Sequence, residues 1–170
     1  MTPGGRGPKR SSPATALGWR EWVQLPELGV RRVKAKLDTG ARTSALHAFG
    51  IREFVRDGVD RVRFEVHPVQ RSAAAAVIAE ATVVDHRAVR NSGGQQELRP
   101  VISTLLKVGD AEWPIELTLT RRDEMGFRML LGRQALRGRA LVDSGRSYRA
   151  GRFTAGSRPR THGPDTLEEE

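Results

Sequence analysis

The stretch that decides the fold is Lys36-Leu37-Asp38-Thr39-Gly40-Ala41-Arg42-Thr43-Ser44-Ala45-Leu46. It places Asp38 at the end of a predicted strand and follows it directly with Thr39 and Gly40. Glycine lets the backbone turn tightly, and backbone N–H groups with a Thr hydroxyl can hold a carboxylate in such a turn. Asp38, Thr39 and Gly40 are therefore the candidate catalytic residues. Taken alone, an Asp-Thr-Gly sequence is also found in ordinary turns.

A second stretch, Met129 to Leu136, favours a functional interpretation of the Asp38 turn over an ordinary turn. Its apolar pair Leu130-Leu131 predicts a short buried strand, and Gly132-Arg133 opens a predicted helix over 133–137. Between the two stretches, Asn91-Ser92-Gly93-Gly94 is a strong turn signal.

In this order, the two stretches resemble those of retropepsins, the single-lobe aspartic proteases of the retroviral type. The resemblance implies that the second stretch supports the active-site loop through Leu130, Leu131, Gly132 and Arg133. It also implies a substrate-contacting set formed by Ala41 and by a glycine-rich flap at Asn91, Ser92, Gly93 and Gly94. The chain is longer between its motifs than the viral enzymes are, and we expect the excess between Phe54 and Asp85.

Residues 20–148 resemble, more specifically, a bacterial and archaeal group of retropepsin-like domains often labelled "ATP-dependent zinc protease". Members occur beside or fused to ATP-grasp ligases of the RimK type, which the resemblance implies as a partner. The matching stretches are 36–41, 43–46, 99–102, 116–120 and 127–132.

Peptide hydrolysis by carboxylates needs one base and one acid, and this chain offers one such Asp turn. The sequence therefore predicts an aspartic peptidase that works as a homodimer, with two Asp38 side chains sharing one proton. Its substrate would be a peptide or protein, and the basic charge would suit acidic, Glu-rich peptides. The alternatives are a catalytically silent peptide-binding module of the same fold and the zinc-dependent peptidase of the family label.

The rest of the pattern predicts an all-β fold, a retropepsin-like closed β-barrel with one short C-terminal helix. Strands are expected over 19–25, 30–37, 61–66, 77–84, 100–108, 113–120, 128–132 and 140–142. Gly109-Asp110 predicts a hairpin. The segment 42–48 is either the start of a strand or a short helical turn.

Composition sets the domain limits. Residues 1–16 and 151–170 are rich in Gly, Pro, Ser and charge and lack apolar periodicity, so both are expected to be disordered tails around a domain at 17–150. There is no cysteine and no apolar run long enough to span a bilayer, and a cytoplasmic protein is expected. The net charge is +9, but no nucleic-acid motif or aromatic run accompanies it, so nucleic acid is not the expected partner.

No metal or cofactor is expected. The four histidines are His47, His67, His86 and His162, and they form no short ligand spacing. His47, nine residues after Asp38, and His86, just before the predicted flap, are the two candidates for a place near Asp38, and each is interpreted as structural or surface. No phosphate-binding glycine loop supports an ATP site. Asp143-Ser144-Gly145 resembles the second catalytic turn of two-lobed enzymes, but no apolar-apolar-Gly segment follows it, so Asp143 is not assigned to catalysis.

Overall fold

The computed structural model describes residues 14–69, 75–90, 93–121 and 126–151. In chain order its elements are β1 (Thr15–Gly18), β2 (Arg20–Leu25), the 3-10 helix η1 (Pro26–Leu28), β3 (Val30–Leu37), β4 (Ala45–His47), β5 (Phe49–Arg56), β6 (Val59–Val66), β7 (Val77–Arg90), β8 (Gln96–Val108), β9 (Ala111–Thr120), β10 (Met129–Leu131), helix α1 (Arg133–Leu136) and β11 (Ala140–Asp143). The all-β prediction is confirmed, with a short helix at the expected place. No helix of these ranges is long and apolar enough to cross a membrane.

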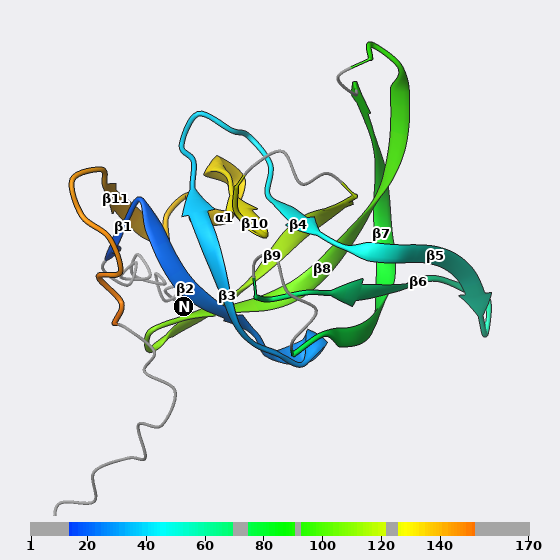
Figure 1. Ribbon diagram of the computed structural model, residues 1–170, viewed down its shortest axis with the longest axis horizontal. Helices are drawn as coiled ribbons and strands as arrows, with labels where there is room; N and C mark the ends of the chain where they lie inside the picture. The colour runs from blue at the N-terminus through cyan, green and yellow to red at the C-terminus, as the bar shows by residue number, and fades with distance from the viewer. Residues whose placement is uncertain (1–13, 70–74, 91–92, 122–125, 152–170) are drawn as a thin grey trace, which may run out of the picture.

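Six strands close into a barrel (Figure 1). They follow the order β2–β3–β10–β4–β9–β8, and Gln24 of β2 pairs with Lys107 of β8 to complete the ring. The predicted closed β-barrel is therefore confirmed. Strand β10 runs parallel to β3 and antiparallel to β4. The segments that follow β3 and β10 consequently leave the barrel at the same end.

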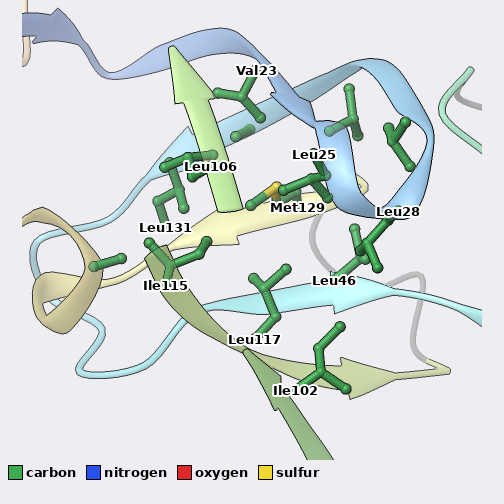
Figure 2. Close-up of a cluster of buried hydrophobic side chains, with 14 of the residues drawn as sticks. Val23, Leu25, Leu28, Leu46, Ile102, Leu106, Ile115, Leu117, Met129 and Leu131 are labelled. Atoms are coloured by element: carbon green, nitrogen blue, oxygen red, sulfur yellow. The ribbon is translucent and has the colours of Figure 1, made fainter. Parts of the chain in front are cut away.

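Alternate residues of the strands fill the barrel. In β3, Val33, Ala35 and Leu37 are buried, while the residues between them face outward. This two-residue period is what predicted the strand. Figure 2 shows part of the core, with labelled side chains from β2, η1, β4, β8, β9 and β10. Burial of each such Leu, Ile or Met contributes about 1.5–3 kcal/mol, so the core positions the strand ends firmly.

Two hairpins extend beyond the barrel (Figure 1). Strands β5 and β6 meet at Asp57-Gly58, where both residues have positive φ (53° and 75°). Strands β7 and β8 pair as far as Arg90 and Gln96. The β5–β6 hairpin and the first part of β7 occupy most of 54–85, the region expected to hold the additional length.

Three elements differ from expectation. Strand β5 was not predicted, because a bulge between Phe49 and Arg52 interrupts its alternation. Strand β7 continues past the predicted end at Val84 to Arg90, and this outer part is polar on both faces. Strand β1 begins at Thr15, two residues before the expected domain start, and pairs with β11.

Within 42–48 the strand β4 covers only Ala45–His47, and the Gly109-Asp110 hairpin is present as predicted.

Candidate active site

Asp38 lies on a turn where β3 leaves the barrel. The Ala41 N–H donates to the Asp38 carbonyl oxygen at 3.2 Å, and the Gly40 N–H donates to the carboxylate Oδ1 at 2.9 Å. Oδ2 accepts no hydrogen bond from the described residues. Asp38 is half-buried, while Thr39 and Gly40 are exposed. The turn therefore presents one available carboxylate oxygen to the surface.

Strand β10 and the start of α1 lie against this turn and hold it. The Asp38 N–H donates to the Leu131 carbonyl at 2.8 Å, which prolongs the parallel pairing of β3 with β10. The Arg133 N–H donates to the Ala41 carbonyl at 2.7 Å. The Arg133 guanidinium donates from one nitrogen, Nη1, to the carbonyls of Thr39 and Gly40, both at 3.0 Å. Two segments about a hundred residues apart thus form one rigid unit.

Gly132 is required by close approach of the backbones. A Cβ at this position would lie 2.4 Å from the Thr43 carbonyl oxygen and 2.9 Å from that of Ala41, which no side chain tolerates. The Gly132 N–H donates to the hydroxyl of buried Ser44 at 3.0 Å. The apolar-apolar-Gly-Arg sequence therefore has a physical reason in this chain, because only Gly lets β10 pass so near the loop.

The glycine-rich turn lies at the tip of the β7–β8 hairpin. Gly93 and Gly94 are described there, and Gly94 has φ +79°, a conformation that favours glycine. Asn91 and Ser92 lie outside the described residues. Figure 1 shows this hairpin and the loop after β3 both rising toward the top of the view.

A polar recess adjoins the loop. This cavity of about 410 Å³ is lined by Ser44, Arg87, Ser103, Pro114, Ile115, Glu116, Gln134, Ala135 and Arg137. Arg87 of β7 and Glu116 of β9 form an ion pair across it at 2.9 Å. The recess borders the supports of the loop rather than Asp38 itself. Sequence reasoning did not find it, because its lining comes from five separate segments.

The described histidines take structural partners. Buried His47 accepts a hydrogen bond at Nδ1 from Arg128 at 2.9 Å, and its ring stacks on Phe49. His67 stacks on the same Phe49 ring, with a centroid distance of 4.1 Å. His86 pairs with Glu53 at 2.5 Å. His162 lies outside the described residues, and within them no three His, Asp or Glu side chains form a metal-binding group.

Asp143, the second acid on an Asp-x-Gly turn, has a different environment. Its Oδ1 accepts the Gly145 N–H at 3.0 Å. Its Oδ2 lies 3.3 Å from Arg149 and 3.5 Å from Arg146. Strand β1 pairs in parallel with β11 as far as this turn, and the Trp19 N–H donates to the Arg146 carbonyl at 2.9 Å, so a second segment holds this turn too. Its carboxylate oxygens, however, are engaged by Gly145 and by the two arginines.

A closed barrel with one Asp-Thr-Gly turn held by Leu-Leu-Gly-Arg defines a retropepsin-like domain. Residues 16–152 match the family described as RimB-like, retropepsin-like aspartic endopeptidase RimB, and the chain belongs to this family. The resemblance drawn from the two motifs is thereby confirmed.

Among curated proteins, the chain is similar to parts of longer ones. It is 47% identical over 132 residues to a probable alpha-L-glutamate ligase of Shewanella pealeana, covering 78% of this chain. It is 50% identical over 135 residues to a protein of the same name from Parasynechococcus marenigrum, covering 79%. The chain spans about 29% of the length of these relatives.

Among solved structures, the chain is similar to a protein of unknown function from Legionella pneumophila. That crystal structure superposes with a TM-score of 0.68 at 28% identity, covering 80% of this chain and 98% of that chain. The likeness extends over nearly all of the second protein.

Proposed function

We propose that this chain is one half of an aspartic-type peptidase that is completed when two copies pair. The observation that carries the proposal is the Asp38 turn. One carboxylate oxygen is held by Gly40, the other has no partner among the described residues, and Arg133 and Leu131 hold the turn from beneath. A site that is rigid and yet open on one side suits a second identical half.

In the proposed dimer, two Asp38 carboxylates meet across the two-fold axis and share one proton, because like charges so close cannot both ionise. The ionised member takes a proton from water, whose oxygen attacks the peptide carbonyl carbon, and the protonated member donates to the carbonyl oxygen. The carboxyl group that took the proton from water then donates it to the nitrogen as the C–N bond breaks, and the other carboxylate takes a proton back from a hydroxyl of the intermediate as the acid product forms.

Two further residue sets complete the proposed site. The Thr39 hydroxyl is exposed and has no hydrogen-bond partner in the described part of the chain, so it is available to bond across the dimer. The turn at 91–94 would act as the flap, closing over an extended peptide from the end of the β7–β8 hairpin.

We propose acidic, Glu-rich peptides as substrates. The net charge of +9 favours an acidic partner, and the similar regions of the curated relatives belong to proteins named alpha-L-glutamate ligases. In this proposal the domain works in the cytoplasm beside a RimK-type ligase.

The second candidate is a peptide-binding module of the same fold without turnover, which the exposed hairpins would equally support. The Asp38→Asn variant separates the two functions. A peptidase loses turnover when the base becomes an amide, whereas a binding module keeps its affinity.

The pairing is tested by mixing wild-type and Asp38→Asn chains at constant total concentration after free exchange. Each mixed pair should be inactive, so an equal mixture should retain about a quarter of the wild-type activity. Mixing with Asp143→Asn chains is the control and should leave activity nearly unchanged. A linear loss to one half, or full activity in a verified monomer, would overturn the shared site.

A further inference from the structure

The outward face of the β2–β3 hairpin carries a row of cations that leads to Asp38. Arg32, Lys34 and Lys36 alternate with the buried residues of β3 and are half-exposed. In the register of the sheet, Trp22 of β2 lies opposite Lys34, and Arg20 lies opposite Lys36. Figure 1 shows this hairpin in blue, ending at the loop that holds Asp38.

Aromatic rings hold these cations in place. The Arg20 guanidinium carbon lies 4.7 Å from the ring centroid of Trp19 and 5.1 Å from that of Tyr148. Lys34 Nζ lies 5.6 Å from the centroid of Trp22 and 5.8 Å from that of Phe127. Such cation–π contacts restrict long side chains without neutralising their charge. The positive groups are therefore arranged before any ligand arrives.

Arg20, Lys34 and Lys36 form no ion pair with a carboxylate of the described residues. The acid within β2, Glu21, points inward, is fully buried and accepts backbone N–H groups of Gly18 and Arg149. Like charges directly opposite each other in a sheet are destabilising, as for Arg20 and Lys36. A local conflict of this kind is expected at functional sites.

The row also borders a cavity. Its volume is about 230 Å³, and it is lined by Trp22, Arg32, Lys34, Pro68, Val69 and Arg128. Along an extended strand, Lys36 lies roughly 7 Å and Lys34 roughly 13 Å from Asp38. The cavity is thus about four residues of extended chain away from the catalytic carboxylate.

We propose that Lys34 and Lys36, with Arg20 and Trp22, form an anion track that binds the side-chain carboxylates of an extended acidic peptide beside the bond to be cleaved. The inference rests on the proposed function and adds its specificity-determining residues. Side chains on one face of an extended peptide repeat at roughly 7 Å, the same interval as alternate residues of β3. This shared interval and the continuity with Asp38 favour a peptide over a nucleic acid.

The test compares two peptides that differ only in Glu against Gln at the positions flanking the cleaved bond. In the Lys34→Gln/Lys36→Gln variant, KM for the Glu peptide should rise about ten-fold or more, with kcat little changed, because charge-assisted hydrogen bonds are lost. The Gln peptide should be processed as by wild type. The matched control is Arg63→Gln, which removes an exposed cation from β6 on the other hairpin and should leave both KM values unchanged. The Lys34→Arg/Lys36→Arg variant should keep the preference for the Glu peptide.

A binding measurement separates this inference from the proposed function. Binding of the Glu peptide to Asp38→Asn protein is followed by tryptophan fluorescence, since Trp22 lies on the track. If the Asp38→Asn protein binds the Glu peptide through Lys34 and Lys36 while the wild-type protein hydrolyses no peptide, the track is supported and the proposed peptidase function is overturned. The track is overturned if the double variant keeps wild-type affinity for the Glu peptide, if no Glu peptide binds, or if a single-stranded oligonucleotide binds more tightly through the same lysines.

Discussion

Two turns in this molecule have the same local structure and different surroundings. Both begin with Asp and have Gly two residues later, and in both the Gly N–H donates to the Asp Oδ1, at 2.9 Å for Asp38 and 3.0 Å for Asp143. In both, the N–H three residues after the Asp donates to its carbonyl at 3.2 Å. Judged by these bonds alone, the two turns cannot be told apart.

A neighbouring parallel strand holds each turn, and the two turns differ in where their arginines bind and in what faces the carboxylate. The Asp38 turn is held by backbone bonds from β10 and by the Arg133 side chain, and these bonds go to carbonyl groups. At the Asp143 turn, Arg149 and Arg146 approach the carboxylate itself. An arginine that bonds carbonyls leaves the acid available for chemistry, whereas an arginine that pairs with the acid occupies it. The Asp-x-Gly sequence therefore specifies a turn, and the groups that face the carboxylate determine whether the turn can act as a site.

The two turns should differ most in the effect on turnover when each Asp is replaced by Asn. Asp38→Asn should reduce kcat by about 10³-fold or more, because an amide cannot serve as base or acid. Asp143→Asn should keep the rate within a few-fold, since it removes only partly exposed ion pairs. Peptidase assays with circular dichroism as the folding control would check both variants. Comparable losses in the two variants would contradict the assignment of Asp38.

The sequence predicted those parts of the fold in which alternation is uninterrupted. Strand β3 matches its predicted range, because buried and more exposed residues alternate through most of it, from Val33 to Leu37. Strand β5 escaped prediction because its bulge displaces the pattern, and the outer half of β7 because it has no buried face. Periodicity reports burial, so elements that project from the barrel carry little of this signal.

The candidate site, too, was predicted from the sequence only in part. Asp38 and the 130–133 stretch were found because each is a contiguous motif, and the structure brings them into contact. The cationic face was missed, although its charge was noted. Its rings are those of Trp19, Trp22, Phe127 and Tyr148, which come from three separate segments of the sequence. The sequence shows no aromatic run beside the charge, whereas the folded chain assembles one from three segments.

The glycine beside the Asp38 turn and the glycine within the Asp143 turn should differ in how well they tolerate a side chain. Gly132→Ala should destabilise the protein by about 3 kcal/mol and abolish most activity, because its Cβ would collide with the carbonyls of Thr43 and Ala41. Gly145→Ala is the matched control, since its Cβ would lie 3.4 Å from Asp143 Oδ1, an ordinary contact. Its cost should stay within about 0.5 kcal/mol. Denaturant unfolding measures both, and equal stability of the two variants would show that the loop does not need β10 at this distance.

The smallest expected effect comes from replacing the arginines that contact the two turns. Arg133→Met removes the donor that bridges the Thr39 and Gly40 carbonyls, so the turn should loosen and kcat/KM should fall about ten-fold, while the barrel stays folded. Arg133→Lys should restore only part of this loss, because a guanidinium is rigid and planar and an ammonium on a flexible stem is not. Arg149→Met removes an ion pair of 3.3 Å to Asp143 and should change neither kcat/KM nor unfolding noticeably. If Arg133→Met kept full activity, backbone bonds from β10 alone would be sufficient to hold Asp38. The bonds from the Arg133 side chain would then not explain why the two turns differ in activity. The difference would lie only in the ion pairs that the Asp143 carboxylate forms.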